Sequence, residues 1–246
     1  MIHPTAVVAD DAELGDDVEI GAFTLVHSGV RVGSGTVIGS HCSIGEPTEL
    51  AGDRPLVLGA GCTVRSHSVI YAGSTFADGL ETGHHATIRE GITAGTNLRV
   101  GTLADLQGDT TFGRFVRLHS NVHVGKGSDV GDFVWIFPFT VLTNDPHPPS
   151  DVAFAGVVIE EFAVVTTMVC IAPGVRVGAR SLVAASSMVT RDVPPDTVVR
   201  GSPARPVGPT SGVVLRDGSG RPAYPWTRHF HRGYPLDVID EWTTES

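Results

Sequence analysis

The sequence predicts an all-β chain wound into a parallel β-helix, and three observations favour this fold class. Large apolar residues recur at every sixth position, small or β-branched residues usually precede them by two places, and glycine often follows them directly. A period of six fits neither an amphipathic helix nor a simple alternating strand. It fits short strands separated by tight turns, and we expect the glycines to supply the positive φ of those turns.

The sixth-residue series covers most of the chain, and within it only Thr82 and Ala94 are not large apolar residues. Three hexads close one triangular coil, so the series predicts about ten stacked coils over residues 1–192. Its members are Ile2, Val8, Leu14, Ile20, Val26, Val32, Ile38, Ile44, Leu58, Val64, Ile70, Phe76, Thr82, Ile88, Ala94, Val100, Leu106, Phe112, Leu118, Val124, Val130, Ile136, Leu142, Ile159, Val165, Ile171, Val177, Val183 and Val189.

Two excursions interrupt the series, over residues 46–56 and 143–157. They follow Ile44 and Leu142, which belong to the same face of the triangular prism. Both are therefore predicted to leave the same edge, because a solenoid accepts insertions only at its corners. The second excursion, which contains TNDPHPPS, is rich in proline and polar side chains.

Residues 193–246 follow the last hexad and are predicted to form a C-terminal cap and tail. The segment is rich in aromatic residues, including Trp226, Phe230 and Trp242. Because the open end of a solenoid needs a cover, we expect the tail to cap it. A contribution of the tail to a ligand pocket is the alternative.

Composition and charge favour a soluble cytoplasmic protein over a nucleic-acid or membrane protein. The formal net charge is −10 and no run of Lys or Arg is present to neutralise phosphates. We expect no nucleic-acid partner and no membrane insertion, since no long apolar segment or basic leader occurs. Cys42, Cys62 and Cys170 are widely spaced and predicted to be reduced thiols.

The histidines form two groups on the predicted prism, and the first is a column at one corner. Coil arithmetic stacks His41, His67 and His85 at one corner, in a column with Phe23, Leu103, Asn121 and Phe139. These histidines are either solvated turn residues or part of a subunit interface.

A second histidine group, His119 with Asn121 and His123, occupies outward or corner positions. The following coils should bring Trp135, Phe137, Phe139 and the proline-rich excursion close to it. This predicts a partly apolar recess suited to a base with a shifted pKa. The excursion leaves from a different corner, which favours a site shared between subunits.

Three stretches carry a resemblance to a known family. HSNVH (119–123), WIFPFTVLTNDPHPPS (135–150) and VTRDVPPDTVVRGSPARPV (189–207) resemble hexapeptide-repeat acyltransferases, in particular N-acetyltransferases of nucleotide-linked amino sugars. The resemblance implies left-handed coiling and acetyl-CoA as co-substrate. It also implies a dTDP- or UDP-linked amino deoxysugar as substrate, and a homotrimer with sites between subunits.

The resemblance and the recess together give each candidate residue a role. His119 and Asp145 are the expected catalytic residues. The expected substrate-binding residues are Asn121, His123, Asn144, His147 and Phe137, and those beside CoA are Ala172, Ala184, Ala185, Arg191 and Arg205. Related sugar O-acetyltransferases have a catalytic histidine before a proline, and His147 before Pro148 corresponds to it in position. O-acetyl transfer is therefore an alternative.

Two further functions stay open. A metal site like that of γ-carbonic anhydrases would use His85, His119 and His123, and a β-helical scaffold would need no site at all. The sequence does not decide which sugar, which nucleotide or which position is acetylated, nor whether a general base is used.

Overall fold

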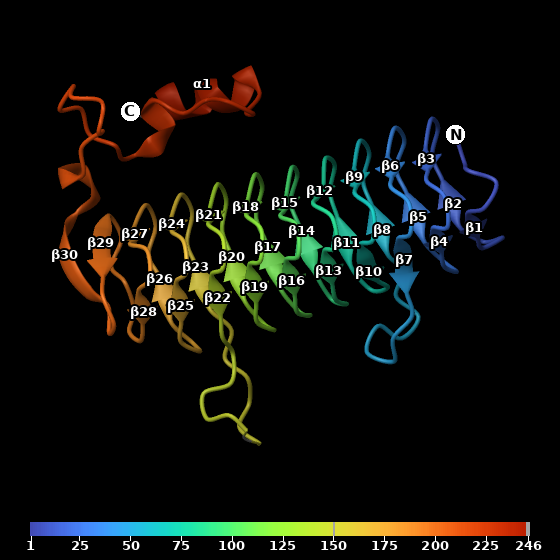
Figure 1. Cartoon of the computed structure of the whole chain (residues 1–246), viewed down its shortest axis with the longest axis horizontal. Helices are drawn as coiled ribbons and strands as arrows, with labels where there is room; N and C mark the ends of the chain where they lie inside the picture. Colours follow the sequence, from blue (N-terminus) through green and yellow to red (C-terminus); the bar gives the residue numbers. More distant parts are fainter. Residues whose placement is uncertain (150, 245–246) are drawn as a thin grey trace.

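The computed structural model describes residues 1–149 and 151–244 and confirms the predicted left-handed parallel β-helix class. Nearly all strands are two residues long and pair in parallel with the strand one coil away, as in Val7 with Leu25. They form three sheets, here sheets I, II and III, along the sides of one prism (Figure 1).

The strands are as follows. Sheet I contains β1 (Val7–Val8), β4 (Leu25–Val26), β7 (Ser43–Glu46), β10 (Val69–Tyr71), β13 (Thr87–Ile88), β16 (Asp105–Leu106), β19 (His123–Val124), β22 (Val141–Leu142), β25 (Cys170–Ile171) and β28 (Met188–Val189). Sheet II contains β2 (Glu13–Leu14), β5 (Arg31–Val32), β8 (Val57–Leu58), β11 (Thr75–Phe76), β14 (Thr93–Ala94), β17 (Thr111–Phe112), β20 (Asp129–Val130), β23 (Val158–Ile159) and β26 (Arg176–Val177). Sheet III contains β3 (Glu19–Ile20), β6 (Val37–Ile38), β9 (Thr63–Val64), β12 (Glu81–Thr82), β15 (Arg99–Val100), β18 (Arg117–Leu118), β21 (Trp135–Ile136), β24 (Val164–Val165), β27 (Leu182–Val183), β29 (Thr197–Arg200) and β30 (Arg205–Pro209).

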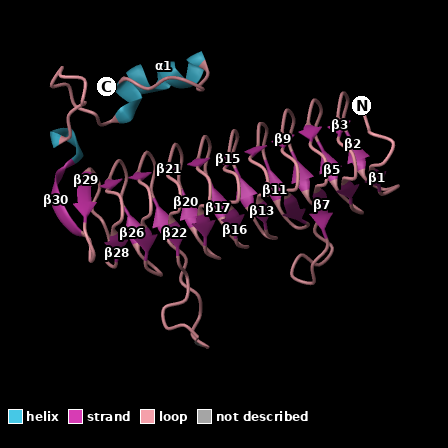
Figure 2. Cartoon of the chain, in the orientation of Figure 1, coloured by secondary structure: helices cyan, strands magenta, loops and turns pink. Residues whose placement is uncertain are grey.

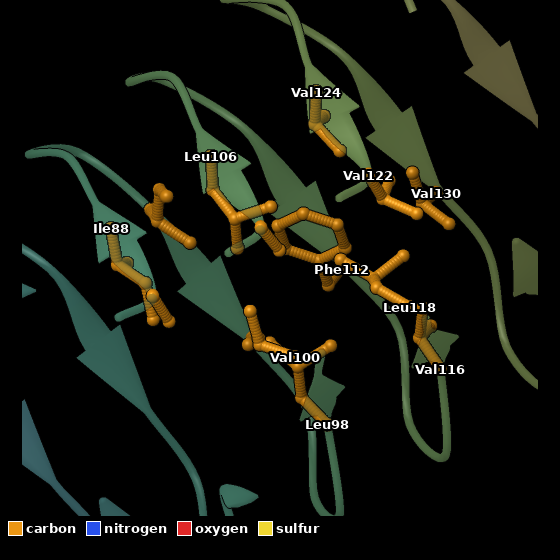
Figure 3. Packing of buried hydrophobic residues seen from close by; sticks show 14 of the residues in the cluster. Ile88, Leu98, Val100, Leu106, Phe112, Val116, Leu118, Val122, Val124 and Val130 are labelled. Carbon is orange, nitrogen blue, oxygen red and sulfur yellow. The ribbon is translucent and has the colours of Figure 1, made fainter. Parts of the chain in front are cut away.

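The predicted sixth-residue series forms the interior of the prism. From Ile20 onward every member is buried, Thr82 and Ala94 included. Figure 3 shows side chains from the three sheets converging around Phe112. The small residues two places earlier are buried too, and the predicted free thiols Cys42 and Cys62 are among them. Ile2, Val8 and Leu14 are more exposed because no described residue packs on the outer side of their coil.

The glycines that follow the series have a different role from the predicted one. None but Gly45 has a positive φ; the left-handed residues stand two places further on, and many are not glycine, such as His67 and Phe133. A Cβ on Gly101 would lie 2.2 Å from the carbonyl carbon of His119 on the next coil. These glycines are therefore needed because adjacent coils approach too closely for any side chain, and not because of the turn conformation.

Replacing such a glycine is expected to cost stability. Gly101→Ala should lower the free energy of unfolding by about 1–3 kcal/mol, because backbone must move to admit the methyl group. Thermal unfolding measures the effect. Gly212→Ala is the control, since a Cβ there meets nothing within 4 Å and no positive φ is required. Equal melting temperatures for the two variants would contradict this explanation.

The two predicted excursions do leave one edge. They follow β7 and β22, both in sheet I and five coils apart in the strand order, and Figure 1 shows both loops on the same side of the prism. Ser150, the last residue of TNDPHPPS, lies outside the described residues.

The C-terminal segment differs from a simple cap. Val193 and Val199 continue the buried interior beyond residue 192, and β30 pairs antiparallel with β29 at the end of sheet III. The tail then turns back along the outside of the prism, through short 3-10 turns at Thr210–Gly212 and Trp226–Arg228, to helix α1 (Leu236–Thr244) (Figures 1 and 2).

An aromatic cluster explains this course. Trp226, Tyr234 and Trp242 of the tail pack on Phe115 and Phe133, which project from coil corners beside sheet III. Packing these large rings along the flank removes their apolar surface from water, which stabilises this course of the tail. The prediction that the tail covers the open end is therefore wrong for most of the tail.

Candidate functional site

A groove of about 610 Å³ lies between the outer face of sheet III and the returning tail. Strands β12, β15, β18 and β21 form its floor, and Phe230, Arg232 and Gly233 of the tail contribute to its wall. Outward side chains of successive coils line up there because each coil repeats the register of the one before. Described residues of the tail therefore line a groove, and the alternative prediction that the tail contributes to a ligand pocket stays a prediction.

Arg117 is the most buried charged group of the groove, with 5% of its surface exposed. Its Nη2 donates to the carbonyl oxygen of Gly233 at 2.9 Å, which ties sheet III to the tail. Its guanidinium also lies 5.0 Å from the ring centre of Tyr234. Among the described residues, Nε and Nη1 have no hydrogen-bond partner. Burial lowers the pKa of Arg117, but a guanidinium keeps its charge at neutral pH.

His119 lies two residues further along the same chain and lines the same groove. Its ring stacks on Phe137 at 4.5 Å between centres and lies 5.8 Å from Trp135. The predicted apolar recess around His119 is therefore present. Burial, and then the charge of Arg117, lower the pKa of His119 below its ordinary value of 6.5. The imidazole is consequently neutral at pH 7 and able to accept a proton.

His123 belongs to another surface. It lies in β19 of sheet I, where Nδ1 is 2.9 Å from Oδ2 of Asp105 on the preceding coil. This bond is the main cause of the lowered pKa of Asp105. Asp105 is a polar partner that the sequence reasoning missed. The signal was present, since Asp105 precedes His123 by one coil and strand pairing places them side by side.

The second excursion begins beside the His123 strand. Nδ2 of Asn144 donates to the Lys126 carbonyl oxygen at 3.4 Å, and Oδ1 of Asp145 accepts the His147 amide at 3.0 Å. Asn144, Asp145 and His147 thus lie at the edge between sheets I and II. His119, Asn121 and Phe137 lie at the edge between sheets III and I. Within one subunit the predicted site residues therefore stay in two separate groups. Phe139, predicted to lie near the recess, is 57% exposed at the corner.

The residues predicted beside CoA are also divided. Ala172 follows β25 of sheet I and is partly buried against the core. Ala184 and Ala185 follow β27 at the edge between sheets III and I, and Arg191 follows β28 and is exposed. Arg205 begins β30, with Nη1 donating to the Ala204 carbonyl oxygen at 2.7 Å.

The predicted histidine column is present. The rings of Phe23 and His41, His41 and His67, and His67 and His85 stack at 5.1, 4.9 and 4.7 Å between centres. All four residues have positive φ. Further along the corner Leu103, Phe139 and Met168 are 55%, 57% and 62% exposed. The corner therefore presents a largely apolar and aromatic seam to its surroundings.

The described residues contain neither a metal-binding group nor a membrane-spanning helix. No group of three His, Cys, Asp or Glu side chains within the described part of the chain is arranged to hold a metal ion. In the same part, α1 and the short 3-10 turns include no segment with the length and apolar character needed to cross a bilayer.

Comparison with known proteins supplies relatives for this fold. No family model matches the chain. It is 39% identical over 93 residues to a 2,3,4,5-tetrahydropyridine-2,6-dicarboxylate N-acetyltransferase of Staphylococcus aureus (strain bovine RF122 / ET3-1), and 38% identical over 93 residues to that of strain JH9. Each match covers 38% of this chain and 33% of the relative, so it spans about a third of the relatives' length.

Solved structures share the fold at low sequence identity. A UDP-N-acetylglucosamine acyltransferase of Arabidopsis has a TM-score of 0.63 at 17% identity, covering 85% of this chain and 74% of its own. The corresponding enzyme from Bacteroides fragilis 9343 has a TM-score of 0.57 at 20% identity, covering 99% and 82%. Fold and repeat define a hexapeptide-repeat β-helix protein. Over the 93 matched residues, the chain is similar to acetyltransferases.

Proposed function

We propose that this protein is an enzyme that transfers the acetyl group of acetyl-CoA to the amine of a nucleotide-linked amino deoxysugar, carried by dTDP or UDP. The observation that carries the proposal is the half-buried His119, stacked on Phe137 at the rim of a cationic groove. The name of the Staphylococcus aureus relatives supports transfer to nitrogen. TNDPHPPS and HSNVH support the amino-sugar substrate by resemblance.

In the proposed reaction the neutral amine attacks the thioester carbonyl carbon. The new C–N bond forms, the C–S bond breaks, and CoA leaves with the sulfur electrons. The proton lost by the amine passes through His119 to the departing thiolate, which gives free CoA thiol. Asp145 of the excursion orients the amine, and backbone amides at a coil corner stabilise the oxyanion.

Turnover with a defined set of acceptors tests the proposal. Purified full-length protein is given acetyl-CoA with dTDP- and UDP-amino sugars, with the matching hydroxy sugars, and with 2,3,4,5-tetrahydropyridine-2,6-dicarboxylate. Released thiol and product mass are measured. Acetylation of an amino sugar alone is the expected result. Acetylation of hydroxy sugars would indicate O-acetyl transfer. Thiol release only with the dicarboxylate would indicate that the dicarboxylate, and not an amino sugar, is the acceptor.

We further propose a homotrimer whose axis runs along the seam from Phe23 to Met168. The seam combines exposed apolar side chains with a column of stacked imidazole rings, and three copies of one corner can bury it together. The trimer also brings the excursion of one subunit to His119 of the next. This arrangement resolves the separation of the predicted site residues within one chain.

Disrupting the seam should dissociate the trimer and abolish turnover. In Leu103→Asp a charge replaces an exposed apolar side chain, so three carboxylates would meet at the axis. Light scattering coupled to size exclusion measures the mass of the particle. Leu50→Asp is the control, since Leu50 is 60% exposed in the first excursion, away from the seam. A Leu103→Asp trimer with normal turnover would refute this interface.

The same seam predicts dissociation in acid. Desolvation, and then the neighbouring His85 and His41, lower the pKa of His67 below 6.5 within one chain. In the trimer three such columns would meet at the axis, so protonation of the imidazoles would place like charges together and weaken assembly as the pH falls below 6.5. We expect the mass to drop toward that of a monomer between about pH 6.5 and 5. His67→Gln should remove part of this response, and an unchanged mass over this range would contradict the proposed seam.

A further inference from the structure

We infer that Arg117 and the tail-walled groove form the binding site for the diphosphate of a nucleoside diphosphate ligand. The inference rests on the proposed function for the identity of that ligand, and on the groove itself for the diphosphate. It gives the C-terminal tail a role in binding that the repeat alone does not provide.

The first argument is the cost of the buried charge. A buried cation is strongly destabilising unless ionic or hydrogen-bonded partners compensate it. Within the described residues no carboxylate pairs with Arg117, and one carbonyl oxygen satisfies only Nη2. Nε and Nη1 keep N–H groups on the two edges of the guanidinium on either side of Nη2, and the oxygens of an anion such as a phosphate can accept from them. An anion bound in the groove would offset the free-energy cost of burying the Arg117 charge.

The second argument is the charge of the surrounding groove. Arg65 and Arg99 both pair with Glu81, so one carboxylate is shared by two cations. Arg232 of the tail also lines the groove and has no ion pair among the described residues. Within a chain of net charge −10, this local excess of positive charge selects an anion with more than one charge. A diphosphate fits better than a single carboxylate.

The third argument is placement relative to His119. Arg117 and His119 flank the inward Leu118 in one extended segment, so both point outward, about 7 Å apart at the rise of a β-strand. That separation suits a sugar ring that joins a phosphate at Arg117 to an amine near His119. Trp135 and Phe230 offer aromatic faces in the same groove for a planar base.

The groove is also distinct from the positions predicted to bind CoA. Ala184, Ala185 and Arg191 lie on later coils and do not line it. The diphosphate of CoA has the same chemistry as that of a nucleotide sugar, so the experiment must separate these two sources.

Calorimetric titration without acetyl-CoA tests the inference. UDP, dTDP, uridine, malonate and CoA are titrated into wild-type protein and into Arg117→Gln and Arg117→Lys. We expect UDP or dTDP to bind, uridine and malonate to bind far more weakly, and Arg117→Gln to weaken diphosphate binding about tenfold or more. Arg117→Lys should recover only part, because an ammonium lacks the bidentate edge.

Arg176→Gln is the matched control. Arg176 occupies the same place in its hexad, before Val177, but lies on sheet II and pairs with Glu160 at 2.8 Å. Its loss changes the net charge equally and should leave diphosphate affinity unchanged. Circular dichroism establishes that each variant is folded, and Phe230→Ala tests the tail wall, with weaker UDP binding expected.

The outcomes separate this inference from the proposed function. Arg117-dependent UDP binding without any acetyl transfer would support the site and refute the transferase. Acetyl transfer to a nucleotide sugar with unchanged diphosphate affinity in Arg117→Gln would refute the site alone. Arg117-dependent binding of CoA but not of UDP or dTDP would also overturn the assignment, because the groove would then hold the co-substrate.

Discussion

His119→Ala is expected to lower kcat by about 10²- to 10⁴-fold, the contribution of a positioned general base. The native imidazole is held neutral by burial and by Arg117, and it stacks on Phe137 at the groove rim. Steady-state turnover with acetyl-CoA and the best acceptor measures the effect. His3→Ala, at an exposed site far along the chain, is the control. Asp145→Asn should also lower turnover, and near-normal rates in both His119→Ala and Asp145→Asn would sink the catalytic assignment.

The pH profile gives this prediction a second readout. Because the pKa of His119 is lowered, its neutral form persists below pH 6.5, and the acid limb of kcat should lie below that pH. In Arg117→Gln the nearby positive charge is removed, so the pKa of His119 rises and the acid limb should move to higher pH. A purely structural role for His119 would leave the limb where it was.

Trp226→Ala is expected to release the tail from the flank of the β-helix at a cost of about 3–5 kcal/mol in docking free energy. Trp226 is 7% exposed and contacts rings on both sides of the junction, including Trp135 at 6.0 Å and Trp242 at 5.3 Å. Loss of this indole leaves a large cavity in the aromatic cluster. The groove would then lose the wall that Phe230 and Arg232 supply, and the KM for the nucleotide sugar should rise.

Limited proteolysis and tryptophan fluorescence measure this release. Cleavage within residues 213–244 should accelerate, while the β-helix core stays resistant because its interior is formed by the coils themselves. Trp226→Phe is the control. It keeps an aromatic ring and sacrifices no hydrogen bond, since Nε1 of Trp226 has no partner among the described residues. A Trp226→Ala protein as resistant as wild type would contradict the packing argument.

The position of each hexad could be predicted because the rule is local. One apolar residue in six must face inward, and any shift of register would place polar residues in the interior. The column from Phe23 to His85 and the common edge of the two excursions follow from counting whole coils, and both are confirmed. The recess of His119 with Phe137 follows in the same way.

The pairing of Asp105 with His123 follows from the same arithmetic, because the two residues are separated by one whole coil, although they are not neighbours in sequence. The glycine rule failed for another reason. Whether Gly101 is needed for its φ or for the closeness of the next coil depends on the separation of two coils, and a sequence pattern contains no such distance.

The sequence by itself determined the repeat, the faces of the prism and the corner on which each polar residue stands, since each depends on periodicity alone. Only the tertiary structure decided where the tail goes. That choice depends on long-range packing of Trp226, Tyr234 and Trp242 against rings more than ninety residues earlier in the sequence, which no local pattern encodes. The same packing buries Arg117, which stands at an outward-facing position of its hexad. Arg117 becomes the candidate anion site because the tail covers it.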